Sequence, residues 1–311
     1  MLHTEWSLVF FTTIAQLATG IMVAVLPFVF AKNHSGYAQD GTGYTQGHHV
    51  YAKLNQTALY VAAGLMVVAL ALSFLHLSNP LHSVYALSNL ETSWLSREIL
   101  FVSLFLFALV LVSFILYFKN PGVKYYRAFI LGAAIIGIIM VYTMSRLYMI
   151  PTVPAWNSLS TPVEFYSSAL LMGSAFVLGL SLQRFYQGTN RQGTNHQGTK
   201  TNMPINPKSK AGVLALMAFL AVAFILLDGL FLNPGVPEAH VAFEPEPVHH
   251  SFIWARWGTI LLGALSIFYI SWKKDRQKHM RLAFYLPFAF FLISELIARA
   301  VFYASYYRIG V

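Results

Sequence analysis

The sequence predicts an all-α fold, a polytopic membrane bundle of eight transmembrane helices with both termini outside. Three observations predict it: the composition, the long apolar segments and the uneven placement of positive charge. Of the 311 residues, 57% are hydrophobic and only 10% are charged, and the mean hydropathy is +0.59. One soluble core of this length could not bury so many apolar residues. A membrane protein is therefore predicted.

Eight apolar segments are each long enough to cross a hydrocarbon core about 30 Å thick. We place the helices near residues 7–31, 56–78, 97–118, 128–149, 165–184, 211–232, 251–272 and 282–305. The whole sequence, 1–311, then forms a single membrane domain. The first apolar segment is too long for the core of a signal peptide, and MLHTEW contains no Lys or Arg, so we expect a retained helix.

Positive charge lies mainly in the four loops that join an odd-numbered helix to the next even-numbered one. These loops hold 15 of the 20 Lys and Arg residues and should be cytoplasmic. Two of them, at about 32–55 and 185–210, are long and polar and predict mobile segments. The other five cations, all Arg, and nine of the eleven acids fall in the outer half. Polar chemistry is therefore expected toward the outer face.

The composition excludes several kinds of site. Without cysteine, the protein can neither form a disulfide nor ligate an iron–sulfur cluster. The net charge of +9 is not arranged as a basic stripe with interleaved aromatic residues, so we expect no nucleic-acid partner. The histidines fall in loops or at helix ends, whereas a bis-histidine haem needs them on facing helices, so we expect no haem. The sequence shows no zinc signature, P-loop or nucleophile elbow, and we predict no metal site.

Two residues could move protons at the outer loop between the second and third helices. The segment FLHLSNPLHSVYALSNLETSWLSREIL places His76 at one helix end and Glu98 near the start of the next. A neutral imidazole can take a proton near neutral pH, and a partly desolvated carboxylate can relay it. Alternatively, His76 is an interfacial histidine bonded to the backbone, and Glu98, beside Arg97, is a helix-start carboxylate favoured by the helix dipole.

Two further outer segments carry candidate residues. SRLYMIPTVPAWNSLSTPVEF holds Arg146, Tyr148, Trp156 and three prolines, which predict either a rigid interfacial anchor or a wall of a pocket for a planar ligand. SELIARAVFY places Glu295 and Arg299 four residues apart on one helix face, where we expect an internal ion pair. Such a pair is mainly structural but would polarise an adjacent pocket.

A third outer segment is acidic and contains histidines. Because the spacing of these residues does not match a metal site, we expect a partner-docking or solvated face. Its members are Asp228, Glu238, His240, Glu244, Glu246, His249 and His250.

Several motifs run through the sequence in a fixed order: EWSLVFFT with Gln16 and Gly20, HLSNP, ALSNL, SREI, RLYMIPTVPAWNSLSTPVEF and SELIARAVFY. As a set they resemble the membrane anchor subunit of the dimethyl sulfoxide reductase family of molybdoenzyme complexes. The sequence departs from the family at Arg97, where we expect Asn, and in its longer first and third cytoplasmic loops.

The resemblance implies a haem-free subunit of anaerobic respiratory electron transport in the bacterial inner membrane. It would oxidise menaquinol and anchor an iron–sulfur subunit and a molybdopterin catalytic subunit that reduces an S- or N-oxide. His76 and Glu98 fall at positions tied to quinol oxidation in the family. Around the headgroup we expect further quinol-binding residues: Arg97, Arg146, Tyr148, Trp156, Glu295 and Arg299.

A subunit without cysteine or haem cannot relay electrons itself, so the quinol site should lie close to a partner's cluster. Since the matched polar motifs fall on the outer face, we expect the soluble subunits to dock on the periplasmic side. Three alternatives stay open: a complex that oxidises a sulfur compound and reduces quinone, a purely structural anchor, and a secondary transporter. The transporter would need inverted repeats with broken helices, which we do not find.

Overall fold

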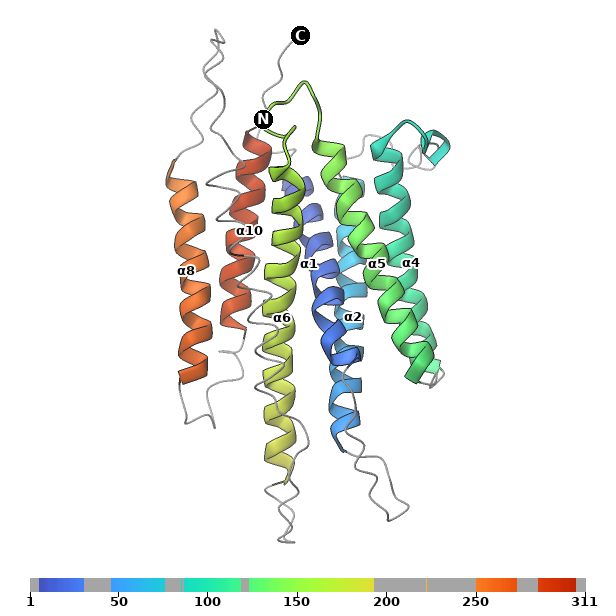
Figure 1. Ribbon diagram of the computed structural model, residues 1–311, viewed down its shortest axis with the longest axis vertical. Coiled ribbons are helices and arrows are strands. Elements are labelled where there is room, and N and C mark those ends of the chain that lie inside the picture. Colours follow the sequence, from blue (N-terminus) through green and yellow to red (C-terminus); the bar gives the residue numbers. More distant parts are fainter. Residues whose placement is uncertain are drawn as a thin grey trace.

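The computed structural model describes residues 6–30, 46–75, 85, 87–118, 123–192, 222, 250–272 and 285–305. Within these residues the fold is all-helical, without strands (Figure 1). The helices are α1 (Trp6–Val29), α2 (Gln46–Leu75), α4 (Trp94–Phe118), α5 (Val123–Tyr148), α6 (Ser160–Gln192), α8 (His250–Trp272) and α10 (Leu286–Ala304), with a short 3-10 helix, η2 (Leu87–Asn89), before α4.

Seven of these helices are long and apolar enough to cross a membrane, which confirms the membrane class and seven of the predicted spans. The predicted helix 211–232 lies outside the described residues except for Val222, which packs against the cluster formed by α6, α8 and α10. The helices α6 and α8 run in the same direction, since Glu164 near the start of α6 bonds Arg256 near the start of α8. Eight spans and the outer position of the termini stay predictions.

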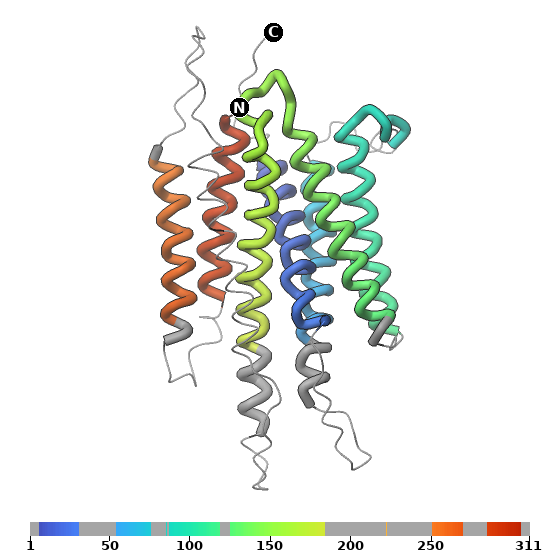
Figure 2. Tube along the Cα trace, viewed as in Figure 1, coloured from blue at the N-terminus to red at the C-terminus, as the bar shows by residue number. Residues whose placement is uncertain are grey.

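Helix α1 lies at the centre of the bundle and packs against α2, α5, α6 and α10 (Figure 2). It is buried along nearly its whole length and has no charged residue. At Gly20 it meets α6 backbone to backbone, because a Cβ built on Gly20 would lie 1.8 Å from the carbonyl oxygen of Ala169. A Cβ on Gly173 would in turn lie 2.0 Å from the carbonyl carbon of Gly20. Small residues at such crossings let transmembrane helices approach closely.

The helices α4 and α8 lie at the periphery and turn large apolar side chains outward. Phe107 of α4 is 64% exposed and Trp254 of α8 is 75% exposed. In water such surfaces would aggregate, whereas in a bilayer they face lipid tails as apolar as themselves. The exposed residues therefore agree with a bundle immersed in lipid.

The two long loops are partly helical where the structure describes them. Helix α2 begins at Gln46 rather than near residue 56, and α6 continues to Gln192 rather than ending near 184. The physical reason is that hydropathy marks the stretch inside the membrane, while backbone hydrogen bonding can continue into water. The rest of both loops lies outside the described residues, and their mobility stays a prediction.

Candidate functional site

Glu98 is a buried carboxylate one turn inside α4. The helix starts at Trp94, and Ser93 caps it by accepting a hydrogen bond from the N–H of Ser96 at 3.3 Å. Glu98 is only 5% exposed, and its Oε1 has no hydrogen-bond partner among the residues that the structure describes. A carboxylate buried in this way is costly unless a ligand, a water or another side chain bonds to it. It lies past the first turn, so the helix dipole alone does not explain its position.

Arg97 and Arg146 meet at the ring of Trp94 rather than at Glu98. The guanidinium carbons lie 4.3 Å and 5.2 Å from the ring centroid, within the range of a cation–π contact. Arg97 also donates to the carbonyls of Leu90 and Glu91, at 2.8 Å and 2.6 Å. These bonds fasten the loop before α4 to the helix. Both cations thus border the same end of the bundle as Glu98.

Tyr148 and Trp156 lie inside the bundle, where they are 8% and 7% exposed. The Trp156 ring stacks on Phe302 at 5.1 Å between centroids, and its Nε1–H donates to the Phe302 carbonyl at 2.8 Å. Tyr148 packs edge-on against both Trp156 and Phe302. This aromatic cluster, completed by Phe165 and Tyr303, fastens the loop after α5 to the end of α10.

Tyr303, which was not predicted as a site residue, forms a hydroxyl pair with Tyr148. The Tyr303 hydroxyl lies 2.8 Å from that of Tyr148 and 3.4 Å from Oγ1 of Thr12 on α1. The Glu98 carboxylate is within electrostatic range of both tyrosine hydroxyls. One turn along α1 from Thr12, Gln16 is fully buried, and neither of its amide atoms has a partner among the described residues. In the sequence, these two residues were marked only by the family-like motifs: Gln16 accompanies EWSLVFFT, and Tyr303 is the last residue of SELIARAVFY.

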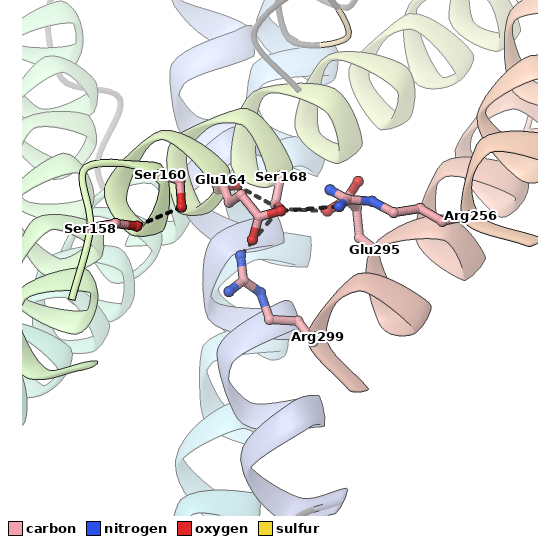
Figure 3. Close-up of polar contacts among 7 residues, drawn as sticks. All are labelled: Ser158, Ser160, Glu164, Ser168, Arg256, Glu295 and Arg299. Carbon is pink, nitrogen blue, oxygen red and sulfur yellow. Dashed lines mark hydrogen bonds and ion pairs between the residues drawn. The ribbon is translucent and has the colours of Figure 1, made fainter. Parts of the chain in front are cut away.

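The predicted ion pair between Glu295 and Arg299 is wrong: no contact of ion-pair length joins them, although both are described. Instead, Ser168 of α6 lies between them, as Figure 3 shows. Its hydroxyl bonds Glu295 Oε2 at 2.5 Å, and Arg299 Nη2 donates to it at 3.3 Å. The Arg299 guanidinium stacks over Phe165, 3.8 Å from the ring centroid. Glu295 and Arg299 therefore each bond Ser168 of the neighbouring helix and not one another.

A neighbouring ion pair joins α6 to α8. Glu164 Oε1 lies 3.0 Å from Arg256 Nη1, and both side chains are partly buried. Sequence analysis had placed both in the outer half but had not paired them, because 92 residues separate them. With Ser168, Glu295 and Arg299, these residues form a polar network shared by α6, α8 and α10 (Figure 3).

The predicted quinol-binding residues fall into three groups in the half of the bundle that holds Glu98. Arg97 and Arg146 border Trp94; Tyr148 and Trp156 belong to the aromatic cluster; and Glu295 and Arg299 belong to the polar network. Arg299 links the last two groups through its contact with Phe165. His76 follows α2 directly but lies outside the described residues, as do the acidic residues of the third outer segment. In the described part of the sequence, no group of His, Asp or Glu could hold a metal ion.

Comparison with known proteins gives one consistent result. The family model of the DMSO reductase anchor subunit (DmsC) matches residues 1–305. The anaerobic dimethyl sulfoxide reductase subunit YnfH of Escherichia coli K12 is 26% identical over 98% of this protein and 96% of its own length. The C subunit of the Haemophilus influenzae Rd anaerobic dimethyl sulfoxide reductase is 27% identical over 59% of this protein and 62% of its own length. The C subunit of the E. coli K12 enzyme is 28% identical over 54% and 55%.

No solved structure matches this protein. The family model, however, spans nearly all of it, and its description as an anchor subunit agrees with the membrane-spanning helices. The chain therefore belongs to the DMSO reductase anchor subunit family, the membrane anchors of that redox enzyme complex.

Proposed function

We propose that this anchor subunit binds and oxidises menaquinol and passes the electrons to an iron–sulfur subunit. The observation that carries the proposal is Glu98, a carboxylate buried in a membrane bundle with one oxygen unpartnered among the described residues. Ionisable residues at such depth are usually functional. Glu98 also lies at the end of the bundle where α2 ends, and His76 is the next residue after α2.

Oxidation of a quinol to a quinone releases two protons and two electrons, so the site needs proton acceptors. His76 would accept the hydrogen bond of one hydroxyl and take its proton, and Glu98 would receive that proton and release it to the outer side. The second proton would leave through Glu98 once the first has been released. Tyr148 and Trp156 would border the ring, while Arg97, Arg146, Glu295 and Arg299 would set the local field. The headgroup would enter between helices from the lipid.

The two electrons have to leave one at a time to a partner, because this subunit has no cysteine to ligate an iron–sulfur cluster. The quinol would therefore bind close to a cluster of the iron–sulfur subunit, which passes electrons to the molybdopterin catalytic subunit. The candidate groups within the described residues lie in the half of the bundle that holds Glu98, from its end to the middle of α10. We assign the docking of the soluble subunits to that end, on the periplasmic side of the inner membrane.

The test is quinol oxidation by membranes that carry the whole complex. We expect His76→Arg and Glu98→Gln to lower oxidation of menadiol, a naphthohydroquinone without an isoprenoid tail, by about a hundredfold or more, because each loses a proton acceptor. Reduction of the terminal substrate with an artificial dye donor, which bypasses this subunit, should persist. Glu91→Gln is the matched control, since Glu91 is exposed on the loop before α4.

If both variants oxidise menadiol at the normal rate, the quinol site lies elsewhere and these residues are structural. If dye-linked activity is lost together with quinol oxidation, the variants have failed to assemble. The two activities are therefore measured on the same membranes.

A further inference from the structure

We propose that Gln16 of α1 binds the second oxygen of the quinol headgroup, one helical turn deeper than Glu98, and that Tyr303 positions the first oxygen through Tyr148. The inference rests on the proposed function and names ligands that the sequence did not predict.

Gln16 is the strongest unexplained polar group on α1. It has no exposed surface, and both Nε2 and Oε1 lack partners among the described residues. A primary amide buried without hydrogen bonds is destabilising, more so in a membrane bundle where water is scarce. Other polar residues on this helix are satisfied; the hydroxyls of Thr12 and Thr13, for example, donate to carbonyls of the preceding turn. The Gln16 amide therefore has the features of a ligand-binding group.

The register of three helices places Gln16 below Glu98. Helices α1, α4 and α5 meet where a Cβ on Gly137 would lie 2.9 Å from Cε2 of Phe105 and 3.1 Å from Oγ1 of Thr19. The Thr19 hydroxyl lies 3.5 Å from the Gly137 carbonyl oxygen, consistent with this meeting point. On α1, Thr12 precedes Thr19 by seven residues, about two turns. On α4, Glu98 precedes Phe105 by the same number. Thr12 and Glu98 therefore lie at the same depth in the bundle.

The contact between Thr12 and Tyr303 supports this register, because Tyr303 also bonds Tyr148 at the end of α5. Gln16 follows Thr12 by four residues on the same face of α1, which places it one turn, about 5.4 Å, deeper. The two oxygens of a hydroquinone lie at opposite ends of one six-membered ring, a separation close to one helical turn. Glu98 and Gln16 can therefore each face one of them.

The chemistry of an amide suits an oxygen that changes state. A hydroquinone hydroxyl can donate to Oε1 of Gln16, and after oxidation the carbonyl oxygen can only accept, which Nε2 of Gln16 can satisfy. A carboxylate lacks the donor and an ammonium lacks the acceptor. Gln16 can thus bind the quinol and the quinone without taking a proton itself. The proton of the hydroxyl at Gln16 leaves by Glu98 after Glu98 has released the first proton to the outer side, so that both protons of the quinol are accounted for.

The hydroxyl pair of Tyr303 and Tyr148 can adopt two hydrogen-bond directions. Thr12 Oγ1 donates to the Leu8 carbonyl at 2.8 Å and can accept from Tyr303. Tyr303 can therefore donate to Thr12 and accept from Tyr148, or donate to Tyr148 at 2.8 Å. In the second arrangement the Tyr148 proton is available to an oxygen beside Glu98. Because this series of hydroxyls ends at a backbone carbonyl, Tyr303 does not conduct protons and acts as a positioning residue.

The experiment compares menadiol kinetics in membranes that carry the whole complex. Gln16→Met keeps the length of the side chain and removes the amide, so we expect KM for menadiol to rise about tenfold with dye-linked activity unchanged. Gln56→Met is the control, because Gln56 on α2 already donates to Tyr60 at 2.9 Å. Tyr303→Phe should lower kcat and shift its pH profile with little change in KM. Its control is Tyr166→Phe, which loses a bond to the Ile138 carbonyl.

The outcomes separate the two proposals. If Glu98→Gln abolishes menadiol oxidation while Gln16→Met keeps the normal KM, quinol oxidation stands and the role of Gln16 is overturned. If Glu98→Gln and His76→Arg have no effect, the proposed function itself fails. Should Gln16→Met not assemble, Gln16→Asn is titrated with a fluorescent hydroxyquinoline N-oxide, a mimic of the quinone headgroup. Weaker binding supports the assignment, and unchanged affinity overturns it.

Discussion

At the scale of single residues, Ser168 connects two buried charged side chains. Its hydroxyl lies between Glu295 and Arg299, which are 0% and 1% exposed, and it also lies 2.8 Å from the Glu164 carbonyl. A carboxylate and a guanidinium are thus held near one another without direct contact. The flat face of Phe165 stabilises the guanidinium through a cation–π contact, which lipid tails could not provide.

We expect Ser168→Ala to destabilise the bundle by about 1–3 kcal/mol, because it leaves two buried polar atoms of α10, Glu295 Oε2 and Arg299 Nη2, without their partner on α6. The measurement is thermal unfolding of the purified complex in detergent. Ser174→Ala is the matched control, since the Ser174 hydroxyl is equally buried but bonds only the Leu171 carbonyl of its own helix. Equal stability of the two variants would contradict a linking role for Ser168.

The sequence predicted Glu295 and Arg299 as site residues but did not predict that both would bond Ser168. Spacing of four residues allows an ion pair on one helix and does not require it. Which bond forms depends on the side chains that the neighbouring helices bring, and Ser168 lies 127 residues away from Glu295 along the sequence. The same reason hid Tyr303 and Gln16, whose importance arises from the packing of α1, α5 and α10. Glu98 was found because its motif lies within one segment.

At the scale of helices, the crossing of α1 and α6 depends on the absence of side chains. We expect Gly20→Ala to destabilise the bundle by about 1–3 kcal/mol, because a methyl group would overlap the Ala169 carbonyl and force the helices apart. Gly64→Ala on α2 is the control, since nothing lies within 4 Å of its added Cβ. At Gly64 we expect no loss of stability, because alanine has a higher helix propensity than glycine. The amount of assembled complex and its unfolding temperature distinguish the two variants.

Hydropathy located the spans but could not tell which helix is central. The most apolar span, α4, is peripheral, whereas the centre belongs to α1, with its threonines, glycine and alanines. In a soluble protein the most apolar helix goes inside, but lipid offers an equally apolar surface outside. Small and hydroxyl-bearing residues, which allow close packing and bonds between helices, mark the interior here. Helix ends were missed for a related reason, since α2 and α6 extend beyond their apolar stretches.

At the scale of the whole molecule, the natural absence of cysteine makes the predicted orientation directly testable. We expect Asn157→Cys, at an exposed position in the loop between α5 and α6, to react with an impermeant maleimide added outside the inner membrane. Lys124→Cys, at the start of α5 on the side predicted to be cytoplasmic, should react only after the membrane is opened. The reverse pattern would invert the topology and move the proposed docking face to the cytoplasm.

The order in which the protein is synthesised gives the polar network a consequence for biogenesis. Glu164 and Ser168 enter the membrane with α6, well before the ribosome makes α10, which carries Glu295 and Arg299. Until α10 arrives, α6 presents a polar stripe that lipid cannot satisfy. A nascent polypeptide that stops before Leu286 therefore exposes a signal that membrane proteases and chaperones can recognise. Insertion of α10 and completion of the polar network become the same event.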